Sequence, residues 1–152
     1  MLNTLGPDYG GHSRADRHII QPGDVLITGA PGVIDGFTTE LERIGDQAVN
    51  MCEYVELLIS EPELKPLIDL PRMAELSRGM VRDALRAFNE RDAARARETL
   101  KTDDMVDAMN DQIFRELLTY TMTAPENITR AMALILTARS LERIADHATN
   151  IC

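Results

Sequence analysis

Aromatic residues are scarce in this chain, which has no tryptophan and only three phenylalanines and three tyrosines. Residues typical of strands are rare beyond the N-terminal third, whereas Ala, Leu, Met, Arg and Glu are plentiful. This balance favours helices over sheets, because the plentiful residues lose little freedom in a helix. The 152 residues suffice for one ordinary domain or two very small ones. We therefore expect an all-α protein.

Cysteine is nearly absent, with one residue at Cys52 and one at Cys152. Nothing in the sequence argues for an oxidising compartment, so we interpret both as small apolar core residues rather than as a disulfide. No signal peptide or long apolar run is visible. The sequence therefore predicts a soluble, cytoplasmic protein without stable membrane insertion.

Positive charge is in deficit, since 16 Lys and Arg stand against 25 Asp and Glu, for a formal net charge of −9. Such a chain as a whole repels nucleic acid and anionic membrane surfaces. A cationic partner or a metal ion is electrostatically easier to accommodate. We therefore expect no nucleic-acid partner.

The N-terminal segment, residues 1–36, differs from the rest of the chain. It carries seven glycines and three prolines between Leu5 and Gly36, and a short β-type run at Val25–Thr28. Glycine and proline at this density interrupt helices, so we predict an irregular leader over 1–36. The stretch IIQPGDVLITGAPGV is similar to a glycine-rich segment of the fumarylacetoacetate hydrolase family. That match is short and lacks the family's catalytic carboxylates, so we expect no activity from this leader.

Beyond Gly36 the apolar pattern is helical. Thr39 and Glu42 resemble a capping box, which predicts a helix start near residue 38. The predicted helices cover residues 38–60, 72–90, 93–122 and 125–152, with a proline-rich bend between the first two and Pro125 in the first turn of the last. The predicted apolar stripe of the first helix is Leu41, Ile44, Gly45, Ala48, Cys52, Val55 and Ile59. The predicted inward residues of the next two helices are Leu76, Met80, Ala84, Phe88, Val106, Met109, Ile113, Leu117 and Tyr120.

One helical phrase occurs twice, as LERIGDQAVNMC at 41–52 and as LERIADHATNIC at 141–152, with eight of twelve residues identical. If each phrase ends a three-helix unit, residues 62–152 form a nearly complete second unit, a three-helix bundle. Residues 37–61 are then the last helix of an incomplete first unit. Because that helix is amphipathic, its apolar stripe has to be buried against another surface.

Acidic residues four positions apart occur in both copies of the phrase and on the helix before the second copy. The candidate metal ligands are Glu42, Asp46, Asp103, Asp107, Glu142 and Asp146. Like charges at this spacing destabilise a helix by roughly 0.2–0.5 kcal/mol. They either line a solvated face with arginine partners, for which Arg43, Arg139 and Arg143 are near, or they hold a metal ion between facing helices. The spacing alone favours the solvated face over the metal site. The occurrence of the same pattern in both copies makes the two interpretations more nearly equal.

No residue pattern in the sequence indicates a catalytic site. A di-iron oxidase would need Glu-x-x-His motifs on paired helices, and neither Glu142 nor Asp146 forms one with His147. His147 is replaced by Gln47 in the other copy, so we interpret it as incidental. Neither a nucleophile–base pair nor a glycine-rich phosphate loop before a helix is visible. We therefore expect that the protein is not an enzyme.

The phrases LERIGDQAVNMCEYV and ARSLERIADHATNIC, with the acidic segment KTDDMVDAMNDQIF before the second, closely resemble the PhoU family over about residues 38–152. The resemblance implies two three-helix bundles, a cytoplasmic location, self-association and metal ions such as iron or zinc at Glu/Asp-x-x-x-Asp motifs. It implies a negative regulator of phosphate uptake and of the phosphate-starvation response. Its implied partners are the ATPase of a phosphate ABC transporter and a sensor histidine kinase.

The same resemblance assigns the candidate ligands to two clusters. Glu42 and Asp46 match the first cluster, whose facing carboxylates are missing together with the opening helices of the first unit. Glu142 and Asp146 match the second, with Asp103 and Asp107 on the facing helix, and we predict that these four converge on one ion. The alternative is a structural helical module that binds a second copy of the chain, or a truncated fragment without function, and holds no metal.

Overall fold

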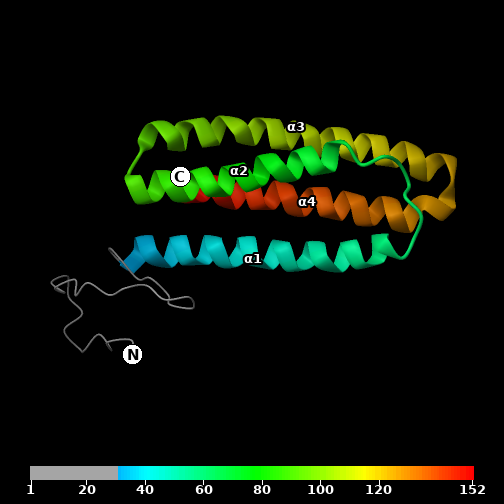
Figure 1. Cartoon of the computed structure of the whole chain (residues 1–152), viewed down its shortest axis with the longest axis horizontal. Helices are drawn as coiled ribbons and strands as arrows, with labels where there is room; N and C mark the ends of the chain where they lie inside the picture. Colours follow the sequence, from blue (N-terminus) through cyan, green and yellow to red (C-terminus); the bar gives the residue numbers. More distant parts are fainter. Residues whose placement is uncertain (1–30) are drawn as a thin grey trace, which may run out of the picture.

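A computed structural model describes residues 31–152, and within them every regular element is a helix (Figure 1). The elements are α1 (Pro31–Ile59), α2 (Asp69–Glu90), α3 (Ala93–Thr123), the short 3-10 helix η1 (Pro125–Asn127) and α4 (Ile128–Ile151). The expectation of an all-α fold is confirmed. The predicted β-type run at Val25–Thr28 and the hydrolase-like stretch before residue 31 lie outside the described residues. In the described part of the chain, no helix is both long and apolar enough to cross a membrane.

Helix α4 is central, because it packs against α1, α2 and α3. Helices α2, α3 and α4 contact one another in all three pairings and form a three-helix bundle. Figure 1 shows α1 running along α4 on the side away from α3. The helices lie near their predicted ranges, whereas the division of the chain into two repeat units stays a prediction. The antiparallel course of α3 and α4 decides which of their side chains meet.

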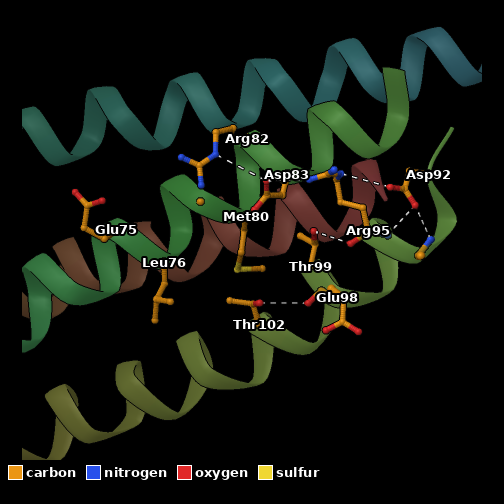
Figure 2. Close-up of a pocket in the computed structure, with 12 residues that line it drawn as sticks. Glu75, Leu76, Met80, Arg82, Asp83, Asp92, Arg95, Glu98, Thr99 and Thr102 are labelled. Carbon is orange, nitrogen blue, oxygen red and sulfur yellow. Dashed lines mark hydrogen bonds and ion pairs between the residues drawn. The ribbon is translucent and has the colours of Figure 1, made fainter. Parts of the chain in front are cut away.

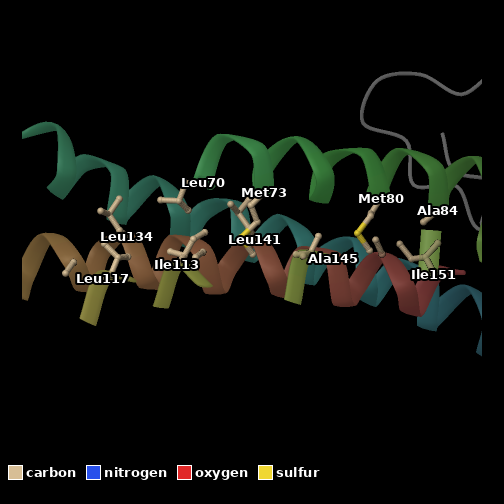
Figure 3. Close-up of a cluster of buried hydrophobic side chains, with 14 residues drawn as sticks. Leu70, Met73, Met80, Ala84, Ile113, Leu117, Leu134, Leu141, Ala145 and Ile151 are labelled. Carbon is tan, nitrogen blue, oxygen red and sulfur yellow. The ribbon is translucent and has the colours of Figure 1, made fainter. Parts of the chain in front are cut away.

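The core lies between the three bundle helices, where Met73, Val106, Ile113 and Leu117 are at most 1% exposed. Figure 3 shows core side chains, among them Met73, Ile113 and Leu117, in a row along α4. Alanines on α4 are equally buried, namely Ala131, Ala138, Ala145 and Ala148. Their small side chains let α4 approach its neighbours on several sides at once. Of the predicted inward residues, Phe88 is an exception, since it is 39% exposed and stacks on Phe37 of α1.

Helix α1 begins at Pro31, earlier than the start predicted near residue 38. The prediction of an irregular leader is therefore wrong for residues 31–36, and the capping box at Thr39 and Glu42 is wrong because both residues lie inside the helix. Proline is well tolerated at the first helical position, where its missing N–H has no intrahelical partner. Gly36 costs roughly 1 kcal/mol relative to alanine, which a long helix packed on α4 offsets.

The turn between α2 and α3 is set by two residues. Arg91 has φ 55°, in the left-handed region, and ends α2. Asp92 begins α3, and its Oδ1 accepts hydrogen bonds from the N–H groups of Ala94 and Arg95 at 3.0 Å each. These bonds, with that from Arg95 first, lower the pKa of Asp92. The predicted break between the helices at 72–90 and 93–122 is confirmed.

The connection between α1 and α2 lies at the end of the bundle opposite the α2–α3 turn, and two side chains hold it there. Lys65, with a side chain only 8% exposed, pairs with Glu116 of α3. Arg130 of α4 donates a hydrogen bond to the carbonyl oxygen of Pro62 at 3.0 Å. The connection is thereby held against both helices of the α3–α4 pair.

Candidate metal centre

Three aspartates from α3 and α4 converge. Asp103, Asp107 and Asp146 each offer a carboxylate oxygen, and these oxygens all lie within 4.8 Å of one another. Asp103 and Asp107 are one helical turn apart and so lie on the same flank of α3. Because α4 packs antiparallel to α3, Asp146 meets them from the opposite helix. Carboxylates from two facing helices form a donor set suited to a hard cation or to iron.

Glu142 lies one turn before Asp146, beside these three aspartates, and its side chain is 13% exposed. Its Oε1 accepts a hydrogen bond from Nη1 of Arg139 at 3.2 Å. Its Oε2 is buried without a hydrogen-bond partner, and the same holds for Oδ1 of Asp103. Buried carboxylate oxygens are normally paired, because leaving one unpaired is unfavourable. Two orphaned oxygens beside converging carboxylates therefore fit a site for a cation.

The electrostatics of the cluster explain why a cation would be favoured. Burial raises the pKa of Asp103, and the charges of Asp107 and Asp146 raise it further. Burial and Asp146 likewise raise the pKa of Asp107, while Arg139 opposes this shift. Burial raises the pKa of Glu142, again against the charge of Arg139. The ionised cluster repels itself, and a bound cation would relieve that repulsion.

The four predicted ligands of the second cluster come together in part. The three aspartates lie within mutual reach, whereas Glu142 lies next to them with one oxygen on Arg139. A solvated face with arginine partners accounts for that one oxygen. It does not account for the buried, unpaired oxygens of Asp103 and Glu142.

The predicted first cluster does not come together in the same way. Glu42 and Asp46 are exposed on α1. Within residues 31–152 they are not joined by a third potential metal ligand. Arg43 pairs with Glu40 at 3.1 Å rather than with either of them. That these two residues bind a metal ion stays a prediction, and their geometry does not support it.

Glu40 of α1 contacts two residues of α4, and the spacing of acidic residues in the sequence does not predict these contacts. Its Oε2 lies 2.7 Å from Nδ1 of His147 and accepts a hydrogen bond from Nδ2 of Asn150 at 3.1 Å. Burial raises the pKa of Glu40, but the bonds from Asn150 and His147 outweigh it and leave the pKa lowered. His147, interpreted from the sequence as incidental, is thus a contact between α4 and α1. No local pattern links Glu40 to residues more than 100 positions later.

The interpretation of both cysteines as core residues is wrong. Cys52 and Cys152 are free and exposed. Cys52 lies on the part of the α1 stripe that α4 leaves uncovered, and Cys152 follows the last residue of α4. The predicted apolar stripe of α1 is largely wrong, because the face that packs on the bundle also includes Met51 and Leu58. The exposed members of the predicted stripe are Gly45, Ala48, Cys52, Val55 and Ile59.

A concave region lies between α2 and the start of α3, and Figure 2 shows its lining side chains. Its charges are mixed. Arg95 lies 3.6–3.8 Å from carboxylate oxygens of Asp83, Glu90 and Asp92, and Arg82 is near Asp83 as well. The two arginines offset part of the negative charge of this region. In the described residues, the converging acidic groups lie between α3 and α4, and not here.

Fold and site together define a helical-bundle protein that presents carboxylates from two antiparallel helices. Comparison with known proteins gives the family, since residues 70–152 match the model of the PhoU domain. The chain belongs to the PhoU family, and the resemblance inferred from its motifs is confirmed.

Several relatives carry the name "Phosphate-specific transport system accessory protein PhoU homolog". The one from Aquifex aeolicus is 44% identical over 105 residues, which cover 69% of this chain and 48% of that protein. The one from Deinococcus radiodurans is 38% identical over 113 residues, covering 74% and 53%. The crystal structure of PhoU from Pseudomonas aeruginosa matches with a TM-score of 0.75 and 37% identity, over 78% of this chain and 57% of that one. The chain spans about half the length of the curated relatives it matches.

Proposed function

We propose that the chain acts as a PhoU-type negative regulator of phosphate uptake and of the phosphate-starvation response. It would couple the ATPase of a phosphate ABC transporter to a sensor histidine kinase, in the cytoplasm and as an adaptor rather than an enzyme. Membership of the family supports this role, as does the description of its relatives as accessory proteins of a phosphate-specific transport system.

We propose further that the α3–α4 site holds a divalent metal ion, such as iron or zinc. The observation that carries this is the convergence of Asp103, Asp107 and Asp146 beside the unpaired oxygens of Asp103 and Glu142. These residues would bind the ion, which would supply the positive charge that the cluster lacks. Since its ligands come from two helices, binding would favour the packed state by mass action.

Metal analysis of the purified chain tests this proposal. The double variant Glu142→Ala/Asp146→Ala should lose most of the bound metal after loading with Mn²⁺, Fe²⁺ or Zn²⁺ and desalting. The matched control, Glu53→Ala/Glu56→Ala, changes two exposed residues on α1 and should retain it. Equal metal in the wild type and the first variant would contradict the site.

The regulatory role is tested separately. The tagged chain, expressed in phosphate-replete cells, should co-purify with a transporter ATPase and a histidine kinase. The Glu142→Ala/Asp146→Ala variant shows whether those contacts depend on the metal site. Recovery of neither partner would contradict the adaptor role and leave the metal result standing.

A second candidate function is a structural helical module, and the uncovered face of α1 favours it. Val49 is 61% exposed, Val55 42% and Ile59 78%. An apolar face of this kind is typical of a contact with another protein surface, and a second copy of the chain is the simplest occupant. Sedimentation showing a compact monomer at all concentrations would contradict it. A melting temperature that depends on metal would favour the first candidate.

A further inference from the structure

Arg139 stands beside the acidic cluster as a cation that belongs to the chain. Its Nη1 lies 3.2 Å from Oε1 of Glu142, and its charge opposes the raised pKa values of both Asp107 and Glu142. The Arg139 side chain is 54% exposed, whereas that of Glu142 is 13% exposed. A half-exposed arginine side chain therefore pairs with a largely buried carboxylate at the edge of the site.

Glu142 is close to the aspartates without being one of the converging group. Asp107 and Asp146 both act on its charge, yet the oxygens within mutual reach are those of Asp103, Asp107 and Asp146 alone among the described residues. One oxygen of Glu142 is held by Arg139, and the other is buried and unpaired. Glu142 is thus a fourth carboxylate with one oxygen on Arg139 and the other unpaired.

We propose that Arg139 is a built-in counter-cation that competes with a divalent metal ion for Glu142 and so sets the metal affinity of the α3–α4 site. With the ion pair formed, Arg139 partly neutralises the cluster and occupies Oε1 of Glu142, so that only Oε2 is available to a metal ion. When Arg139 is displaced, both oxygens of Glu142 can join the aspartates. This inference rests on the proposed metal function and adds the regulation of that site.

The physical basis is repulsion between two cations that share one set of carboxylates. A guanidinium and a divalent ion on neighbouring oxygens repel each other, so that binding of either one disfavours the other. The coupling is reciprocal, and metal binding weakens the Arg139–Glu142 pair by the same factor. Since arginine does not deprotonate in proteins, this counter-charge is constant over the physiological pH range.

Replacement of Arg139 separates this role from that of an ordinary surface ion pair. An ordinary pair contributes a little stability, and its loss leaves metal affinity unchanged or weaker. Loss of a counter-cation instead changes stability and metal affinity in opposite directions. Without Arg139 the metal-free protein is less stable, because the cluster repels itself more strongly, whereas the metal binds more tightly because its competitor is gone.

Titration calorimetry of the full chain with Mn²⁺, after treatment with a chelator, makes the comparison. Arg139→Met should bind Mn²⁺ about tenfold more tightly than the wild type, within the usual range of such couplings. It should also melt at a lower temperature in the absence of metal. Arg139→Lys, which keeps the charge, should stay close to the wild type. Arg143→Met is the matched control, since Arg143 acts on Glu142 by charge without forming an ion pair to the described residues.

The outcomes distinguish the inference from the function on which it rests. If the wild type binds Mn²⁺ and Arg139→Met binds it equally or more weakly, the inference is overturned and the metal site stands. If Arg143→Met tightens binding as much as Arg139→Met, the specific pairing is overturned. If neither the wild type nor Arg139→Met binds, both proposals fail. Arg139→Gln provides a second neutral variant, so that a folding defect of Arg139→Met does not decide the result.

Discussion

Glu40 of α1 and His147 of α4 lie 107 positions apart in the chain, yet Oε2 of one is 2.7 Å from Nδ1 of the other. Their side chains are 13% and 14% exposed, so that this contact is largely shielded from water. The same oxygen of Glu40 accepts a hydrogen bond from Asn150. These contacts join the first half of α1 to the end of α4, directly beside the candidate ligand Asp146.

Loss of the Glu40 carboxylate should loosen α1 from α4. We expect Glu40→Ala to lower the free energy of unfolding by about 1–2 kcal/mol, because two hydrogen bonds to a charged group are lost. Urea denaturation measures the loss, and hydrogen exchange should show faster opening of α1 than of α3. Glu53→Ala, at an exposed position on α1, serves as the control. Equal stability of the two variants would show that the contact contributes nothing.

The Lys65–Glu116 pair should be more stabilising than the exposed ion pairs within single helices, because Lys65 is 8% exposed. We expect Lys65→Met to lower the free energy of unfolding by about 0.5–1 kcal/mol, because Glu116 loses its partner but is itself 36% exposed and can be hydrated. The control Lys101→Met breaks an exposed pair with Glu98 and should change stability by at most about 0.5 kcal/mol. A double-mutant cycle with Glu116→Gln measures the coupling, and an additive result would contradict the expectation.

Gly45 occupies the position in the first phrase that Ala145 occupies in the second. A Cβ built on Gly45 meets nothing within 4 Å. We therefore expect Gly45→Ala to raise the free energy of unfolding by about 0.5–1 kcal/mol, the difference in helix propensity between the two residues. Thermal or urea denaturation detects this gain. A loss of stability would mean that the exposed face of α1 is covered by another surface that leaves no room for a methyl group.

The raised pKa values of the cluster predict how stability depends on pH without metal. A carboxyl group whose pKa is raised in the folded state contributes stability at low pH and loses it as the pH rises through the folded-state pKa. For Asp103 this window lies above its ordinary value of 3.8. Ionised Asp103 should therefore destabilise the metal-free protein above its folded-state pKa, and this effect should be lost as the pH falls through that pKa.

Asp103→Asn tests this sign directly. In the presence of a chelator at pH 7 the variant should be more stable than the wild type by roughly 0.4–1 kcal/mol, which corresponds to two like-charge pairs. The difference should shrink as the pH is lowered from 7 toward 3.8, because the wild-type carboxyl, whose pKa is raised above that value, is progressively protonated over this range. Glu56→Gln, at an exposed position on α1, should show no comparable trend. A difference that grows at low pH would contradict the prediction.

The helices could be predicted from the sequence because their signals are local. The spacing of Val106, Ile113 and Leu117 marks a buried face, and all three are buried. The start of α1 could not be predicted in this way. Pro31 is compatible both with a break and with the first turn of a helix, and packing on α4 decides between them. The spacing also predicts that Phe88 faces the core of the bundle. It instead stacks on Phe37 of α1, and the sequence pattern does not show where α1 packs.

The candidate site could be predicted only in part, because local sequence patterns do not show how the helices pack. Spacing places Asp103 and Asp107 on one flank of α3, and a short connection to α4 implies the antiparallel pairing that brings Asp146 opposite. The hold of Arg139 on Glu142 depends on side-chain conformation, which spacing does not determine. The contact of Glu40 with His147 depends on how α1 packs, which no local pattern encodes.

The central claim is that Asp103, Asp107 and Asp146 hold one divalent ion between α3 and α4. The most direct measurement is an anomalous difference map from crystals of the full chain grown with Mn²⁺, beside crystals of Asp103→Asn/Asp146→Asn. The account predicts a single strong peak between the three carboxylates in the wild type and none there in the variant. An empty site in the wild type, or an equal peak in the variant, would contradict it.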